Sequence, residues 1–306
     1  MATGAADERK GKQLFKQKSA RPTEELSAVA RQDDAAHDVL ISIRTDVGCV
    51  REANEDSGVC FKPSDPTELA SHGILILVAD GMGGHASGEV ASRIAVETIK
   101  RAYYRAKEGS AEALRKAFEE ANEQIYAAAH EDPKLLGMGT TGTALVILGG
   151  QAFAAHVGDS RLYMLRGGDL YQLTEDHSEV MEMVKRGIIS QEEARTHENK
   201  NVILRALGTG PAVEVSTWDA PLAVRVGDQF LLCSDGLHDM VEDALISEIV
   251  AAATDPHDAC DQLVAKARER GGHDNITVGI AAVVPEGTNG TEAGNLRATR
   301  EVETIR

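Results

Sequence analysis

Short apolar runs of strand length recur along this chain. They alternate between apolar and polar positions or are apolar throughout, which is typical of strands buried on one face or on both. The predicted strands lie at 39–44, 74–79, 143–148, 152–157, 162–166, 213–218, 229–233 and 276–283. Two connections contain paired glycines, Gly149-Gly150 and Gly167-Gly168, and such short turns favour antiparallel pairing of neighbouring strands.

Elsewhere the apolar positions follow the spacing of an amphipathic helix. The predicted helices lie at 87–107, 111–130, 242–253 and 256–270. Ser110 is expected to cap the second helix, and Asp255 followed by Pro256 is expected to begin the fourth. Because the helices are grouped apart from runs of consecutive strands, the sequence predicts an α+β fold and not a doubly wound parallel sheet.

Composition narrows the class of protein. The chain has 306 residues and a formal net charge of −17, so it is long enough for one large domain and too acidic to favour a nucleic-acid backbone. No apolar run is long enough to cross a membrane, and no secretory signal is recognisable, so we predict no membrane partner. The four cysteines lack CxxC spacing and lie in or beside apolar stretches, which favours buried free thiols and a cytoplasmic location.

The two ends of the chain differ from the body. Segments 1–38 and 285–306 carry almost no net charge and show no sustained apolar period. We therefore predict a partly disordered N-terminal extension at 1–38, a folded domain at 39–284 and a flexible tail at 285–306.

Aspartates follow or precede several of the predicted core strands. Asp80, Asp159 and Asp235 come at or just after the ends of apolar runs, and Asp274 precedes another. Charged groups at core strand ends need a shared cation or another partner, because burial without one is costly. With Glu55-Asp56 they form an all-oxygen set, which selects hard divalent ions such as Mg²⁺ or Mn²⁺.

Two neighbouring features add to this acidic set. Gly81 follows Asp80 directly, and the absence of a side chain would let its backbone carbonyl approach an ion. Arg51 lies four residues before Glu55, where a guanidinium could receive a phosphate with two parallel hydrogen bonds or could simply neutralise the acids.

The order of the motifs resembles a known family, the metal-dependent or type 2C protein phosphatases, and in particular its bacterial branch. The matching stretches are GCVREANED (48–56), DGMGGH (80–85), GMGTT (137–141), HVGDSR (156–161), LTEDHS (173–178), SDGL (234–237) and GHDNIT (272–277). The resemblance covers about 39–284 and implies a four-layer α-β-β-α sandwich. It also implies hydrolysis of phosphoserine and phosphothreonine by direct attack of a hydroxide that bridges two metal ions, in opposition to bacterial Ser/Thr kinases.

The resemblance also assigns roles to the acids. Asp80 would bridge both metals, Asp235 and Asp274 would complete the shell of the first, and the Gly81 carbonyl would help to bind the second. Glu55 and Asp56 would orient metal-bound waters or ligate the second ion. Two further assignments concern a weaker third metal, held by Asp159 with Asp235, and the substrate phosphate, bound by Arg51. The ions would be Mn²⁺ or Mg²⁺.

One position departs from the family pattern. Eukaryotic relatives have a histidine directly after the Asp-Gly pair, proposed as general acid, where this chain has Met82. Leaving-group protonation is therefore open between His85 and a metal-bound water, and His85 could instead fix its loop. Thr140, Thr141 and the Asp176–Ser178 stretch are interpreted as structural.

The family resemblance leaves some choices of function open. Segment 178–204 is polar and corresponds to the family's mobile flap over the site, although it could be a surface helix pair that only covers the sheet. The phosphatase reading competes with a catalytically silent phosphoprotein-binding module and with an enzyme dedicated to one regulatory phosphoprotein. A silent module would be expected to lack a metal-binding acid, whereas Asp80, Asp159, Asp235 and Asp274 are all present.

Overall fold

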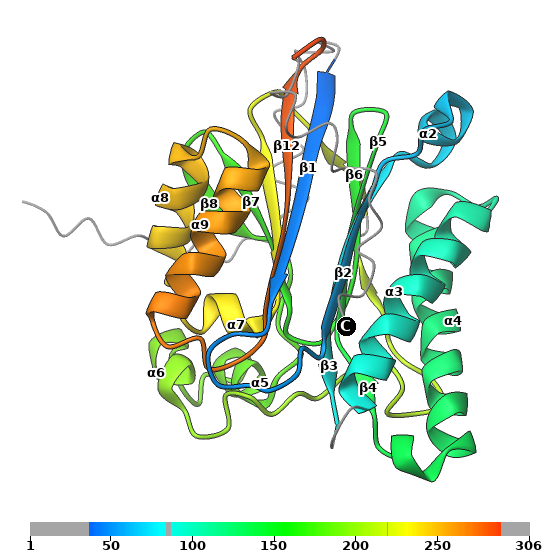
Figure 1. The fold of residues 1–306 in the computed structure, drawn as a ribbon, viewed down its shortest axis with the longest axis vertical. Helices are drawn as coiled ribbons and strands as arrows, with labels where there is room; N and C mark the ends of the chain where they lie inside the picture. Colours follow the sequence, from blue (N-terminus) through cyan, green and yellow to red (C-terminus); the bar gives the residue numbers. More distant parts are fainter. Residues whose placement is uncertain (1–36, 84–86, 219, 289–306) are drawn as a thin grey trace, which may run out of the picture.

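Two antiparallel sheets lie face to face, and helices cover the outer face of each, so four layers follow one another across the molecule (Figure 1). The computed structural model describes residues 37–83, 87–218 and 220–288. The predicted α+β sandwich is confirmed. Most of the predicted extension and tail, 1–36 and 289–306, lies outside the described residues.

The first sheet has the strand order β1-β12-β11-β7-β8. Its strands are β1 (His37–Asp46), β12 (Ile276–Pro285), β11 (Gln229–Cys233), β7 (Arg161–Arg166) and β8 (Asp169–Gln172). All neighbours in this sheet are antiparallel, and β12 joins the start of the domain to its end by pairing with β1. The paired glycines Gly167-Gly168 close the β7–β8 turn with positive φ angles, as their residue type allows.

The second sheet has the main order β10-β6-β5-β3-β2, with two short strands added at its sides. Its strands are β10 (Leu222–Ala223), β6 (Gln151–Val157), β5 (Gly142–Leu148), β3 (Ile74–Met82), β2 (Asp56–Phe61), β4 (Gly139–Thr140) and β9 (Ser216–Thr217). The central strand β3 is buried on both faces, which explains why its sequence is apolar without alternation.

Helices lie outside both sheets and in the connections. They are α2 (Pro66–His72), α3 (Ser87–Arg105), α4 (Ser110–Glu131), η1 (Pro133–Leu135), α5 (Glu179–Lys185), α6 (Gln191–Thr196), α7 (Asp235–His238), α8 (Asp243–Ala252) and α9 (Pro256–Glu269). The pair α3 and α4 covers the second sheet, whereas α8 and α9 cover the first (Figure 1). Asp255 caps α9 as predicted, because its side chain accepts the backbone N–H groups of His257 and Asp258.

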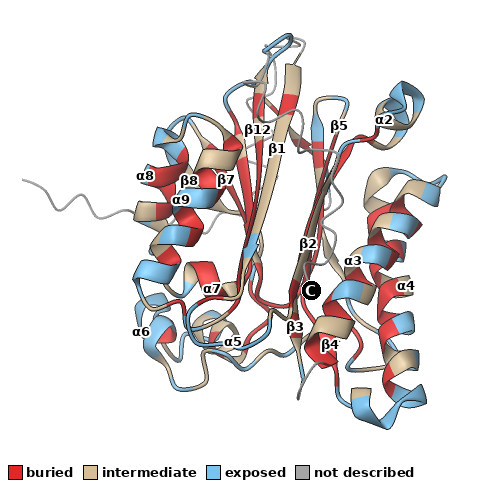
Figure 2. Cartoon of the chain, viewed as in Figure 1, coloured by how far each residue is buried: buried red, intermediate tan, exposed pale blue. Residues whose placement is uncertain are grey.

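The core has three apolar parts, one between the sheets and one under each helical layer (Figure 2). Ile76, Val78 and Leu232 belong to the inter-sheet core, whereas Leu75 and Leu77 of the same β3 strand face α3 and α4. Each fully buried apolar side chain of this size stabilises the fold by about 1.5–3 kcal/mol relative to exposure. The sheets are therefore held in fixed relation, which positions the residues at their ends.

Three local predictions were wrong. Ser110 is the first residue of α4 and not its cap: Gly109 occupies the cap position, while the Ser110 hydroxyl accepts a hydrogen bond from Tyr103. The predicted strand at 213–218 is reduced to Ser216–Thr217, because Val213 and Val215 pack against the core without joining the ladder. Cys49 is exposed, although Cys233 and Cys260 are buried; all four cysteines are free.

Candidate active site

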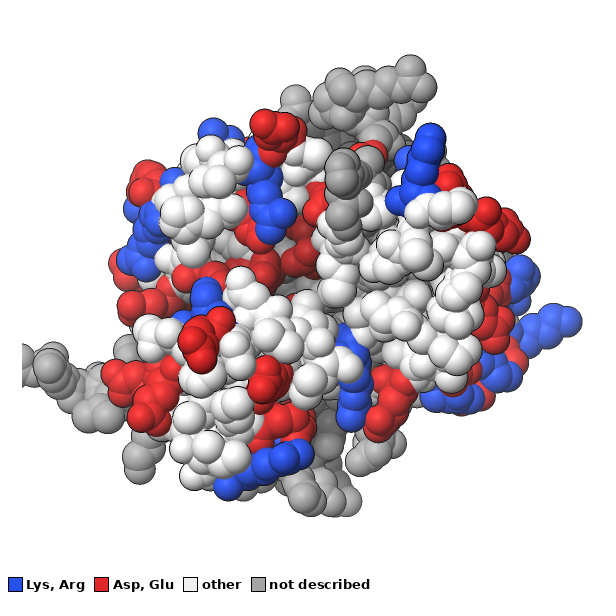
Figure 3. Space-filling model, turned by 90° about the horizontal axis from the view of Figure 1, so that it is seen from below, with Lys and Arg blue, Asp and Glu red and all other residues white. Residues whose placement is uncertain are grey.

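The predicted acids lie at one end of the sandwich, where strands of both sheets begin or end. Asp56 is the first residue of β2 and pairs in register with Asp80 of β3. From the other sheet, Asp235 begins α7 after β11, and Asp274 lies just before β12. Asp159 lies between β6 and β7. Seen from this end, acidic side chains gather around a hollow near the middle of the molecule (Figure 3).

Burial and mutual repulsion raise the pKa values of four carboxyl groups, those of Asp56, Asp80, Asp159 and Asp235. The pKa of Asp80 lies well above its ordinary value, first because of burial and then because Asp56, Asp235, Asp159 and Asp274 are near. Burial raises the pKa of Asp56 to about 6 and that of Asp159 to about 7, and it also raises the pKa of Asp235. Such a cluster attracts divalent cations, because a cation offsets both desolvation and repulsion.

Three of these acids retain a buried carboxylate oxygen that has no hydrogen-bond partner. The atoms are Oδ1 of Asp56, Oδ1 of Asp159 and Oδ1 of Asp235. Buried acceptors are normally paired, so three unpaired oxygens in one acidic region fit a site for hard cations. The roles of the individual acids as metal ligands stay predictions.

The side chains do not by themselves enclose an ion. Among the residues that the structure describes, no three His, Cys, Asp or Glu side chains form a ready-made metal-binding group. Mg²⁺ keeps several waters and is commonly held by only one or two carboxylates, and Mn²⁺ favours similar oxygen ligands. The donor set therefore fits hydrated divalent ions better than an ion enclosed by protein.

Hydroxyl groups hold the two central acids in place. The backbone N–H of Asp80 donates to Thr141 Oγ1 at 2.9 Å, and its carbonyl accepts from Thr140 Oγ1 at 2.8 Å. Asp56 Oδ2 accepts from the buried Ser234 hydroxyl at 2.7 Å, which leaves Oδ1 unpaired. Thr140 and Thr141 thus have a structural role, because both hydrogen-bond the main chain of Asp80 and hold it in position.

Gly81 lies where the chain has no room for a side chain. A Cβ atom there would lie 2.2 Å from the Gly88 carbonyl oxygen and 2.4 Å from that of Glu55. The Gly81 N–H also donates to the Glu55 carbonyl at 3.2 Å. The glycine therefore permits the close approach of three chain segments next to Asp80.

Arg51 and Glu55 belong to the segment 47–55, which crosses from β1 to β2 beside the acids. Nη2 of Arg51 lies 2.7 Å from Oδ2 of Asp274, and this ion pair is the main cause of the raised pKa of Arg51. The pKa of Glu55 is raised by burial, and nearby Arg51 partly opposes this shift. The structure thus brings a guanidinium to the edge of the acid cluster.

Comparison with known families decides the identity of this fold and site. The family model described as protein phosphatase 2C matches residues 65–267. The chain belongs to the protein phosphatase 2C family. It is a metal-dependent enzyme of the serine/threonine protein phosphatase class, with phosphoproteins as substrates.

Curated relatives come from bacteria. The serine/threonine phosphatase stp of Listeria monocytogenes serovar 1/2a is 42% identical over 243 residues, which cover 77% of this chain and 92% of the relative. The serine/threonine protein phosphatase PstP of Mycobacterium tuberculosis H37Rv is 39% identical over 244 residues, which cover 79% of this chain and 44% of the relative.

Solved structures agree with the fold. The Mycobacterium tuberculosis serine/threonine phosphatase PstP/Ppp superposes with a TM-score of 0.71 at 36% identity, covering 80% of this chain and 98% of that one. The catalytic domain of PstP in complex with two manganese ions has a TM-score of 0.70 at 35% identity, covering 81% and 100%.

Sequence reasoning missed two polar residues of this phosphatase. Ser234 directly precedes Asp235 and bonds Asp56, and Asn275 directly follows Asp274 and bonds the 47–55 segment. A signal was present, because each is a polar residue next to a predicted metal acid at a core strand end. Their partners, however, lie far away in sequence. His85 lies outside the described residues, so its two predicted roles stay open.

The predicted flap of this phosphatase contains the two short helices α5 and α6. Lys200 pairs with Asp239 of the α7 end, and Arg195 lies 3.4 Å from Asp243 of α8. The backbone N–H of Leu204 donates to the His177 carbonyl at 2.7 Å. The segment therefore contains a helix pair that contacts α7 and α8, and its role as a mobile flap stays a prediction.

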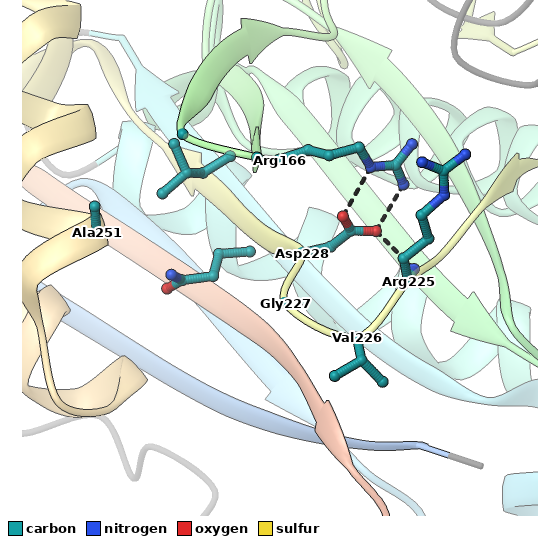
Figure 4. Close-up of a pocket in the computed structure, with 10 residues that line it drawn as sticks. Arg166, Arg225, Val226, Gly227, Asp228 and Ala251 are labelled. Atoms are coloured by element: carbon teal, nitrogen blue, oxygen red, sulfur yellow. Dashed lines mark hydrogen bonds and ion pairs between the residues drawn. The ribbon is translucent and has the colours of Figure 1, made fainter. Parts of the chain in front are cut away.

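A pocket of about 430 Å³ lies at the opposite end of β11 from Asp235. In it the carboxylate of Asp228 accepts two hydrogen bonds from Arg166, at 2.8 and 2.6 Å (Figure 4). Oδ2 of Asp228 also accepts the backbone N–H of Arg225 at 2.7 Å, and the Arg166 side chain points away from Ala251 (Figure 4). The ion pair in this pocket links the turn after β7 to the turn before β11, and the pocket is separate from the acid site.

Among the residues that the structure describes, none of the helices has the length and apolar character of a membrane-spanning segment.

Proposed function

We propose that this phosphatase hydrolyses phosphoserine and phosphothreonine in one step, by in-line attack of water-derived oxygen on phosphorus without a phosphoenzyme. The observation that carries the proposal is the convergence of Asp56, Asp80, Asp159 and Asp235 at one end of the two sheets, with buried carboxylate oxygens left unpaired. Such a site is built for cations, and a phosphate monoester is an anion that cations attract.

The acids divide the cation sites between them in this proposal. Asp80, Gly81, Asp235 and Asp274 would hold two ions, Mn²⁺ or Mg²⁺, and Asp159 with Asp235 would hold a weaker third. Bound divalent ions supply a lowered pKa for water, toward about 7, and polarise the phosphoryl oxygens. The unpaired oxygens of Asp159 and Asp235 support this division.

The remaining residues position substrate and water. Arg51 would bind the phosphate through its guanidinium, because the Arg51 side chain is 48% exposed and therefore open to solution. Glu55 and Asp56 would orient water as hydrogen-bond acceptors. Met82 carries no proton to donate, so the leaving group takes its proton from water or from His85 in this scheme.

The cellular setting is proposed on the same footing. The catalytic domain would span 39–284, with a mobile flap at 178–204 that selects substrates, and the segments 1–38 and 285–306 would flank it. The enzyme would oppose bacterial Ser/Thr kinases in the cytoplasm, where the four free cysteines would stay reduced. A silent binding module is not favoured, because Asp80, Asp159, Asp235 and Asp274 are all present.

The test is hydrolysis of a phosphothreonine peptide by the full chain with Mn²⁺, with Mg²⁺ and with EDTA, beside the Asp80→Asn protein. We expect metal-dependent release of phosphate that the substitution abolishes. Folded wild-type protein that binds Mn²⁺ and leaves phosphopeptides intact would overturn the proposal.

A further inference from the structure

The side chain of Asn275 holds the 47–55 segment through three hydrogen bonds. Its Nδ2 donates to the carbonyls of Val47, at 3.0 Å, and Ala53, at 2.9 Å. Its Oδ1 accepts the backbone N–H of Glu55 at 2.8 Å. With only 4% of Asn275 exposed, these bonds are shielded from water and are correspondingly costly to lose.

Only an amide satisfies this arrangement. Two carbonyls need donors and one N–H needs an acceptor, so the orientation of the Asn275 amide is fixed by its partners. An aspartate of the same shape would accept from Glu55 but would place a carboxylate against two carbonyl oxygens. The site therefore distinguishes asparagine from its isostere by hydrogen bonding and not by size.

The two halves of the segment are attached differently. Near its start, Cys49 N–H donates to the Gly272 carbonyl at 2.7 Å, and a Cβ at Gly48 would lie 2.2 Å from the Asp274 carbonyl oxygen. The middle is open, since Arg51 is exposed and the segment pairs with no strand. The bonds from Asn275 reach both Val47 and Ala53, so they span the open part that carries Arg51.

We propose that Asn275 is a positioning residue that fixes Arg51 relative to Asp274 for phosphate binding. This inference rests on the proposed role of Arg51 in the phosphatase reaction. Asn275 and Asp274 are neighbours in the chain. The same short stretch therefore positions both the segment that carries Arg51 and a predicted metal ligand. Loosening the segment would spread Arg51 over many positions and weaken the binding of substrate more than the step at phosphorus.

The test combines hydrogen exchange of the metal-free full chain with kinetics on a phosphothreonine peptide in Mn²⁺. In Asn275→Asp, we expect amides in 47–55 to exchange about tenfold faster or more, because loss of the clamp is worth at least one hydrogen bond. Protection in α4 and β5 should be unchanged. The KM for the peptide should rise about tenfold, with kcat changed less than about threefold.

Asn122→Asp is the matched control. Asn122 is also buried, accepts from Gly208 N–H at 2.8 Å and donates to the Gly210 carbonyl at 3.1 Å, but it clamps a different loop. It should lower the melting temperature and leave exchange in 47–55 and the KM for the peptide as in wild type. If Asn275→Asp fails to fold, Asn275→Ala removes the same bonds without adding a charge and has the same expected result.

Unchanged exchange in 47–55, or a wild-type KM despite faster exchange, would overturn the assignment. A loss of kcat alone would do so as well, since a positioning role for Arg51 acts on substrate binding. If the wild-type enzyme itself releases no phosphate, the proposed function fails, whereas the exchange experiment still reports whether Asn275 holds the segment.

Discussion

Arg51 and Asp274 form an ion pair in which the guanidinium Nη2 lies 2.7 Å from the carboxylate Oδ2. The other oxygen of Asp274 accepts the N–H of Asn275 at 2.8 Å, so both oxygens are engaged. The carboxylate of Asp274 thus pairs with Arg51, and in the proposed function it would also bind a metal ion. The two cations compete for one ligand, and occupancy of the metal site would release Arg51 toward phosphate.

Arg51→Ala is expected to separate the two roles. Loss of the guanidinium should raise the KM for a phosphothreonine peptide by about tenfold or more, since charge-assisted pairs to phosphate are strong. Mn²⁺ should bind the substrate-free enzyme more tightly, because Asp274 loses its competitor and the site loses a positive charge. Calorimetric titration measures the affinity.

Arg268→Ala is the control for the general effect of charge. Arg268 pairs with Asp46 at 2.7 Å, at the end of β1 next to the segment that carries Arg51. If it tightens Mn²⁺ binding as much as Arg51→Ala does, competition for Asp274 is not the cause.

Asp80→Asn is expected to abolish turnover while leaving the metal-free fold intact or slightly more stable. Neutralising one acid relieves its repulsion with Asp56, Asp159, Asp235 and Asp274. Thermal melts with and without Mn²⁺ measure the effect: the ion should raise the melting temperature of wild type and have little effect on the mutant. A mutant that melts far below the metal-free wild type would contradict this reading.

Asp228→Asn is expected to behave in the opposite way, with a loss of stability and no loss of chemistry. Asp228 is only 2% exposed and pairs with Arg166 at the end of β11 far from the acids. Removal of one partner from a buried pair costs about 3–5 kcal/mol. Urea unfolding measures the cost. Arg105→Ala, which breaks an exposed pair with Glu120, should cost about 1 kcal/mol or less; equal losses would contradict the argument.

His156 and His177 should make the fold sensitive to acid. Burial lowers the pKa of His156 to about 4 and that of His177 to about 3, so both stay neutral in the fold at pH values where an unfolded chain binds protons. With an unfolded pKa near 6.5, their contribution to stability is full above about pH 6.5 and declines below it. The raised pKa values of the buried carboxyl groups have the opposite effect, because their contribution to stability falls as pH rises.

The contribution of His156 is therefore measured as the difference between the pH dependence of the unfolding free energy in wild type and in a variant. His156→Gln should show a smaller loss of unfolding free energy between pH 7.5 and about 5 than wild type does. Urea titrations at several pH values measure it. Parallel pH curves for the two proteins would show that His156 is not a source of the acid sensitivity.

The sequence predicted the architecture where local pattern decides structure. The runs at 74–79, 143–148 and 229–233 are strands, as expected for short, mostly apolar runs whose length suits a strand buried between two layers. The run at 213–218 instead alternates between apolar and polar residues, Pro211 and Pro221 bracket it, and only Ser216 and Thr217 of it pair with β6. Whether such a run joins a ladder depends on the partner strand.

The acids of the site were predictable and their supports were not. A carboxylate at the end of a core strand is costly by itself, so Asp80 and Asp235 could be identified before any partner was known. Ser234 and Asn275 carry no such cost, because a hydroxyl or an amide in the same place could have bonded its own backbone. Their roles became visible only when Asp56 and the 47–55 segment were seen beside them.

The acids come from both sheets, and this has a mechanical consequence. Asp56 and Asp80 are fixed to one sheet, Asp235 and Asp274 to the other, and the inter-sheet core that includes Val78 and Leu232 keeps those sheets apart. The thickness of that core therefore sets the distance between the carboxylates of one sheet and those of the other. Val78→Ala removes no charged group and should still alter the affinity for Mn²⁺, because it changes the packing between the sheets. An unchanged affinity would refute this. The apolar core between the sheets can therefore tune which ion the acidic site prefers.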